Sequence, residues 1–139
     1  MPYLQYYESK ETGVTVVSMG PDDCFLDGIR EVAKKADIHT GVIQFGLGGL
    51  KKVNFTEGSE TKELEGFFQI FNFTGLIASY EPHIHITMVD INSKELMGGH
   101  LNDGTVVGSV VEFSILRLPD LKLASDYRDG SAVKLLCQI

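Results

Sequence analysis

Long apolar runs, cysteines and positive charge are all scarce in this 139-residue sequence. No apolar run approaches the roughly 20 residues that a membrane-spanning helix needs, so we expect no membrane partner. The first residues, MPYLQ, lack the basic start and the apolar stretch of a secretory signal. We therefore expect a cytoplasmic protein. Its length suffices to bury a core, and residues 1–139 are expected to form a single domain.

Cysteine is represented by Cys24 and Cys137 alone, and their spacing matches neither a metal-binding nor a redox-active motif. The sequence therefore contains no cysteine-based metal site. We expect both residues to be buried thiols, in the reduced state that an intracellular location favours.

Positive charge is outnumbered, with 12 lysines and arginines against 19 aspartates and glutamates and a net charge of −7. The largest basic clusters are Lys34-Lys35 and Lys51-Lys52. Few phosphates could be neutralised at once, so DNA is a conceivable partner that the charge disfavours.

Histidine, in contrast, is concentrated. His83 and His85 alternate along the segment PHIHI at 82–86, and His100 follows Gly98-Gly99. Residues two apart on a strand point to the same side, so the first two imidazoles can converge. With His100 they would supply the three ligands of a zinc site that keeps one open position. The alternative is that the pair simply lies on the exposed face of an amphipathic strand; the third histidine favours the metal site.

The pattern of apolar residues predicts one helix among several strands. Small or apolar residues recur at helical spacing between Asp23 and Ala36, after a possible cap at Asp22-Asp23. Strands are predicted at 12–19, 41–45, 50–55, 66–73, 76–80, 83–89, 105–118 and 133–138.

The connections between these strands also carry predictions. Residues 46–49, GLGG, lack the ending of a phosphate-binding loop and are interpreted as a tight turn or bulge. Residues 56–63 are expected to form an exposed loop. A hairpin turn at 92–94 would fold the chain back and bring His100 towards the histidine pair.

Carboxylates near the histidines are candidates for acid or base chemistry. Glu112 lies in the apolar run 106–115, which is typical of a strand buried on both faces. A buried glutamate would have a raised pKa suited to proton transfer. It could equally form an ion pair, with Arg117 or Arg128. Glu81 and Asp90 flank the histidine strand and are further candidates.

The order of several segments resembles a known family. These are the helix, the glycine-rich segment, GFFQIFNFTG at 66–75, HIH at 83–85, GGHL at 98–101 and VEF at 111–113. Together they resemble the PPC (plants and prokaryotes conserved) domain, of the stand-alone prokaryotic type that is labelled predicted DNA-binding protein. The resemblance implies an α/β (α+β) fold, mostly antiparallel sheet with one main flanking helix. It also implies a homotrimer, with His83, His85 and His100 as ligands of zinc or another divalent transition metal.

Two departures from the plant members limit what the resemblance implies. The sequence has no Arg-Gly-Arg-Pro hook for the minor groove of DNA. The plant interaction motif Gly-Arg-Phe-Glu-Ile stands here as GFFQI at 66–70, without its charged residues. We expect Phe68, Phe71 and Phe73 to lie in the core or a subunit interface rather than to stack on bases.

Three functions therefore compete. The first is a DNA-binding protein or a regulatory interaction module. Its histidine site would steady a loop or sense metal. The second is a metal-dependent enzyme that uses the same histidines. The third is a small-molecule binder with cupin-like chemistry, although the acid after the pair is Asp90 rather than a glutamate. We favour the first, and with it a non-enzymatic role.

Overall fold

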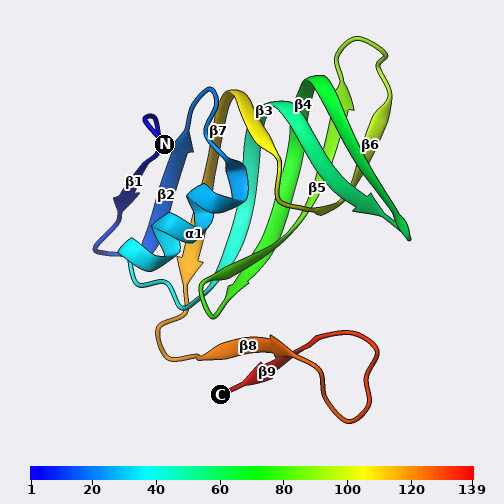
Figure 1. Cartoon of the computed structure of the whole chain (residues 1–139). Helices are drawn as coiled ribbons and strands as arrows, with labels where there is room; N and C mark the ends of the chain where they lie inside the picture. Colours follow the sequence, from blue (N-terminus) through cyan, green and yellow to red (C-terminus); the bar gives the residue numbers. More distant parts are fainter.

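The computed structural model describes all residues, 1–139, and contains one helix among nine strands (Figure 1). In chain order the elements are β1 (Gln5–Glu8), β2 (Val14–Met19), α1 (Phe25–Lys35), β3 (Thr40–Glu57), β4 (Glu60–Ala78), β5 (Glu81–Asp90), β6 (Leu96–Leu101), β7 (Val106–Arg117), β8 (Leu123–Asp126) and β9 (Leu135–Gln138). Every strand pair is antiparallel. The predicted fold class, mostly antiparallel sheet with one flanking helix, is confirmed. The helix is too short to cross a membrane.

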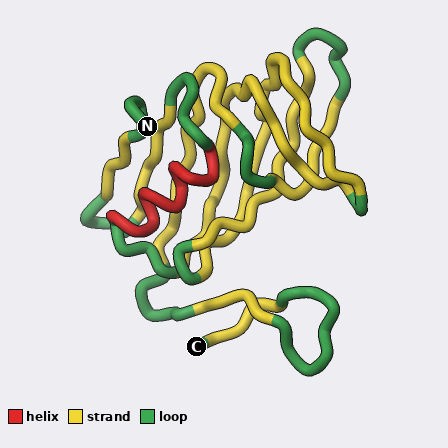
Figure 2. Tube along the Cα trace, in the orientation of Figure 1, coloured by secondary structure: helices red, strands yellow, loops and turns green.

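Seven strands form one curled sheet in the order β1-β2-β7-β3-β4-β5-β6. The sheet closes on itself at one end, because β6 also pairs with β3 through Phe55–Leu101 and Thr56–His100. Strands β8 and β9 form a separate hairpin beyond the lower ends of the sheet strands, as Figures 1 and 2 show.

The core lies between α1 and the concave face of the sheet. Phe73 of β4 sits at its centre, edge-on to Phe25 of α1 and to Phe113 of β7, with ring centroids 5.1 and 5.4 Å apart. Gly46 of β3 leaves the room for this ring: a β-carbon there would lie 2.0 Å from Phe73. The Phe73 ring therefore contacts the helix and two neighbouring strands, β3 and β7.

The helix begins two residues later than predicted and is capped differently. Its N-cap is Cys24, which makes no side-chain cap hydrogen bond. Asp23 does not cap the helix, because its Oδ2 accepts a hydrogen bond from the backbone N–H of Gly20 at 3.0 Å. Both cysteines are free, but Cys24 is exposed and Cys137 half-buried, so the prediction of buried thiols is wrong.

Two pairs of predicted strands are each one long strand. Residues 46–49 are not a turn, since β3 runs through them with register shifts at Ile43/Phe45 and Gly48/Leu50, which confirms the alternative of a bulge. The predicted loop at 56–63 shrinks to a tight turn that joins β3 to β4. The hairpin turn at 92–94 is confirmed, whereas β1, β6 and β8 were not among the predicted strands.

We predict that Gly46→Ala destabilises the protein by about 3 kcal/mol, because the added methyl overlaps the Phe73 ring in a packed core. Gly58→Ala is the matched control. Its β-carbon meets nothing, but its φ of 64° is in the left-handed region, so only about 1 kcal/mol of backbone strain is expected. Urea denaturation of both variants measures the difference, and equal losses would contradict the role given to Gly46.

Candidate metal centre

The three predicted histidines come together on the outer face of the sheet. His83 and His85 point outward from β5 while Ile84 and Ile86 are buried beneath them. His100 of β6 is the register partner of His85. The three ring centroids are 4.9 to 5.6 Å apart, and one nitrogen from each ring lies within 4.8 Å of the others. The sequence prediction that these rings converge is confirmed.

Close packing of β5 against β6 makes this convergence possible. Gly98 lies against β5, where a β-carbon would stand 2.2 Å from the carbonyl oxygen of Ile86. Any other residue at this position would push the two strands apart and separate His100 from His85. Gly99 lies equally close to β3, where a β-carbon would stand 2.3 Å from the carbonyl oxygen of Thr56. The glycine pair before His100 therefore lets β6 approach both of its neighbours.

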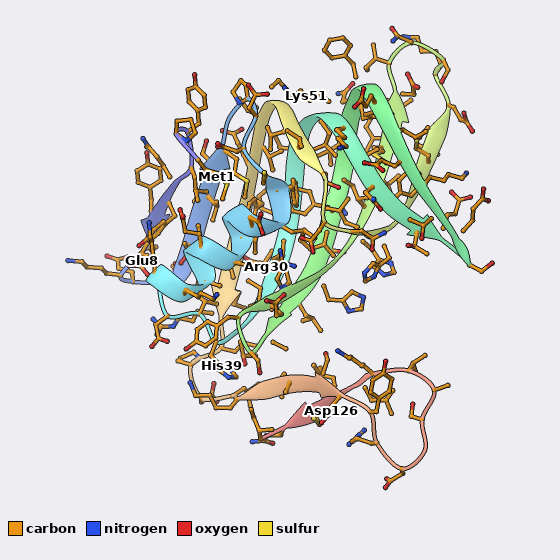
Figure 3. All side chains as sticks on the ribbon, viewed as in Figure 1. Met1, Glu8, Arg30, His39, Lys51 and Asp126 are labelled. Carbon is orange, nitrogen blue, oxygen red and sulfur yellow. The ribbon has the colours of Figure 1, made fainter.

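The electrostatics of the cluster favour the neutral form of His83 and His100. Burial, followed by the nearby His85, lowers the pKa of His83. Burial and then the charges of His83 and His85 lower the pKa of His100. No protein group hydrogen-bonds to any of the three rings. Their nitrogen lone pairs are thus free for a metal, which binds neutral imidazole. The fourth histidine, His39, is elsewhere and contacts Thr40 (Figure 3).

A cavity opens beside the cluster. It has a volume of about 670 Å³, and His83 and His100 form part of one wall while the β8–β9 hairpin forms another. His85 instead faces a second, more polar depression of about 480 Å³ that includes Asn72, Thr74 and Thr87. The histidine cluster is therefore open to small molecules on both sides.

Comparison with known proteins places the chain in a family. Residues 6–119 match the family model of the Plants and Prokaryotes Conserved (PCC) domain. The chain belongs to the PCC family. This is the family that the sequence resemblance indicated under the name PPC.

Solved structures share the whole fold with this PCC protein. A candidate DNA-binding protein from Bacteroides thetaiotaomicron superimposes with a TM-score of 0.83 at 18% identity, covering 97% of both chains. A metal-containing protein from Archaeoglobus fulgidus gives 0.75 at 18% identity over 99% of both chains. A PPC protein from Pyrococcus horikoshii gives 0.73 at 19% identity, covering 100% of this chain and 97% of that one. No curated protein matches.

Glu112 of this PCC protein is not buried, contrary to the sequence prediction. It is exposed, as are Ser109 and Val110 on the same strand, so β7 is not buried on both faces. Strands β3 and β4 separate it from the histidines. Arg117 pairs with Asp37 instead, at 3.6 Å. Glu112 is therefore not a buried acid. The outer face of this sheet carries apolar residues, so the sequence of an exposed strand has the same apolar pattern as that of a strand buried on both faces.

The other two candidate acids, Asp90 and Glu81, differ in their contacts. The Oδ1 of Asp90 accepts hydrogen bonds from the backbone N–H groups of Asn92 and Ser93 and so shapes the hairpin turn. Glu81 lines the cavity with His83, but its carboxylate accepts a hydrogen bond from Nε of Arg30 at 3.0 Å. Of these candidates, Glu81 alone shares a cavity with the histidines.

The role of Arg30 was not predicted from the sequence, because its position matches the polar face of an amphipathic helix. It reaches from α1 to Asp103 at 2.7 Å and to Glu81 at 3.0 Å (Figure 3 labels Arg30). These two carboxylates, Asp103 first, raise its pKa further above the ordinary value. Arg30 therefore ties the start of β5 and the turn before β7 to the helix.

We predict that the metal-free protein loses thermal stability as the pH falls from about 7.5 to about 5.5. Unfolding restores the pKa of His83 and His100 to about 6.5, so the unfolded chain takes up protons first and is favoured below that pH. The double variant His83→Gln/His100→Gln, which cannot take up these protons, should lose part of this pH dependence. His39→Gln, away from the cluster, is the control. Melting curves in the presence of a chelator test this, and an unchanged slope in the double variant would refute it.

Proposed function

We propose that this PCC protein is a metal-dependent interaction or regulatory module, homotrimeric, with a zinc-type ion held by His83, His85 and His100. The observation that carries the proposal is the approach of three imidazole nitrogens to within 4.8 Å of one another. Neutral imidazole suits zinc, and three protein ligands leave one position open. The metal-containing relative from Archaeoglobus fulgidus supports the same interpretation.

The donor set fits such an ion. Zinc bound tetrahedrally at roughly 2.0–2.1 Å from each nitrogen places its ligand nitrogens about 3.4 Å apart. Rings without hydrogen-bond partners reach that spacing by small rotations, and the backbone beneath them is fixed by the β5–β6 pairing. When bound, the ion supplies a Lewis acid at the open position. The protein's part is to hold the three rings close together and to keep the cavity beside them open.

An enzymatic role is the second candidate, and the cavity beside the histidines favours it. The acid for it would be Glu81, which is in that cavity, rather than Glu112. Its carboxylate is paired with Nε of Arg30 at 3.0 Å, so Glu81 would have to leave this ion pair before it could take part in proton transfer. A regulatory role needs no such group, and it remains the first proposal.

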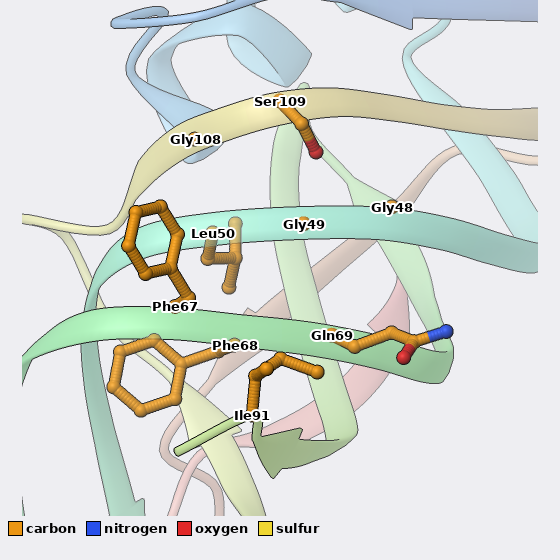
Figure 4. Close-up of a pocket in the computed structure, with 9 residues that line it drawn as sticks. All are labelled: Gly48, Gly49, Leu50, Phe67, Phe68, Gln69, Ile91, Gly108 and Ser109. Atoms are coloured by element: carbon orange, nitrogen blue, oxygen red, sulfur yellow. The ribbon is translucent and has the colours of Figure 1, made fainter.

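The apolar outer face of β7, β3 and β4 supports self-assembly. Phe67 is 66% and Phe71 57% exposed, and Phe45, Leu47 and Val110 are exposed beside them. Phe67 and Ile91 line a hollow of about 360 Å³ on this face, together with Leu50 and Gly108. Figure 4 shows the Phe67 ring beside Leu50. Monomeric proteins seldom expose so continuous an apolar patch. We propose that this face, defined by these five exposed residues, is the trimer interface.

DNA has little electrostatic support as a partner, although a relative from Bacteroides thetaiotaomicron is a candidate DNA-binding protein. Six of the twelve basic residues, among them Lys51 and Lys52, already form ion pairs with carboxylates. With a net charge of −7 and no run of basic residues longer than two, the chain offers few unpaired cations to a phosphate backbone. We therefore do not assign DNA as the ligand of this chain.

We predict that the purified protein binds about one zinc per chain and that His85→Ala lowers this stoichiometry at least tenfold while the protein stays folded. His85 is exposed, so removing its ring costs little packing. His39→Ala, which leaves the cluster intact, should retain the metal. Elemental analysis with circular dichroism gives both readings. Full zinc content in His85→Ala would disprove the site, and loss of folding would make the metal structural.

We predict a sedimentation mass of three times the chain mass of 15.3 kDa. Phe71→Asp should give monomers, because a charge buried in an apolar interface cannot find a partner. Val133→Asp is the control, since Val133 is comparably exposed at 62% but lies in the loop between β8 and β9. A trimer that survives Phe71→Asp would show that this face is not the interface.

A further inference from the structure

The cavity beside the histidines is closed by a part of the chain outside the PCC match, which ends at residue 119. The β8–β9 hairpin is fixed to the sheet by two hydrogen bonds. The hydroxyl of Ser79 donates to the carbonyl of Leu123 at 3.0 Å, and the N–H of Leu123 donates to the hydroxyl of Thr40 at 3.1 Å. The hairpin is thus held as a wall rather than trailing from the fold, although its strands lie apart from the sheet (Figure 1).

Most of the rest of the cavity wall is apolar. Leu76 of β4 and Leu135 and Leu136 of β9 line it and remain 37 to 43% exposed. Three smaller apolar residues complete the lining, namely Ala78, Pro82 and Ala124. The volume of about 670 Å³ lies within the range of small-molecule sites. Such a lining suits a hydrocarbon body rather than a sugar or a nucleotide.

The uncompensated charge of the cavity is positive. Lys134 lines it from the hairpin and forms no ion pair with any carboxylate; its Nζ lies 5.9 Å from the Tyr127 ring. The one carboxylate in the lining, Glu81, is neutralised by Arg30. A divalent ion bound by the three histidines would add positive charge on the other side. The cavity therefore favours an anionic group on its ligand.

We propose that this cavity binds a small carboxylic acid with a hydrocarbon body, whose carboxylate lies between the metal and Lys134 and whose body packs on Leu76, Leu135 and Leu136. This inference rests on the proposed metal centre and names its ligand class. Carboxylate oxygen is an accepted zinc ligand, and an ammonium group strengthens its binding. The hairpin then determines which acid fits, while the sheet holds the metal.

The test uses octanoate as the probe and the full chain loaded with Co²⁺, whose visible spectrum reports on the ligands at the open position. Octanoate should change this spectrum in a saturable way, and 1-octanol, which has the same body without the charge, should bind at least tenfold more weakly. Lys134→Ala should weaken octanoate binding about tenfold by calorimetry. Lys122→Ala, at an exposed lysine outside the cavity lining, should change it less than twofold.

The outcomes separate this inference from the metal centre. A protein that takes up no Co²⁺ disproves the proposed function itself. A Co²⁺-loaded protein that gives no spectral change and no heat with octanoate disproves the inference alone. Equal binding of octanoate and 1-octanol, or equal effects of the two lysine substitutions, would also overturn it. Leu136→Ser gives an independent reading, because it should weaken octanoate but leave acetate binding unchanged.

Discussion

Strand β6 is bound on both of its edges, and the position of His100 depends on this. On one edge it pairs with β5 through His85–His100, and on the other with β3 through Thr56–His100. A strand held by two neighbours cannot slide along either of them without breaking both sets of hydrogen bonds, and a slip of one residue would turn His100 to the opposite face. The closure of the sheet therefore fixes a site that lies outside the core.

The glycines of this sheet allow the closure. Gly98 lets β6 approach β5, and Gly46 accepts the ring of Phe73 that joins the sheet to the helix. Each is a position where a side chain would force two elements apart. The outer site and the inner core are therefore linked through backbone spacing rather than through a chain of polar contacts.

Much of this was predictable from sequence because the signals are local. Alternation along β5 placed His83 and His85 on one side, and the turn at 92–94 brought His100 back to them. The exposure of Glu112 could not be predicted in this way, since an apolar outer face gives the same residue pattern as a buried one. Arg30 and Lys134 were missed for another reason: their partners and surroundings are distant in the sequence.

The hairpin of β8 and β9 is attached to the sheet through a few contacts, with Leu123 bonded to both Thr40 and Ser79. Its residues contribute nothing to the pairing of β5 with β6. Substitutions in it can therefore accumulate without disturbing the imidazoles. In evolutionary terms, one wall of the cavity and the three imidazoles are encoded in separate stretches of the gene, so the shape of the cavity can diverge between descendants of one ancestor while the histidine cluster is conserved.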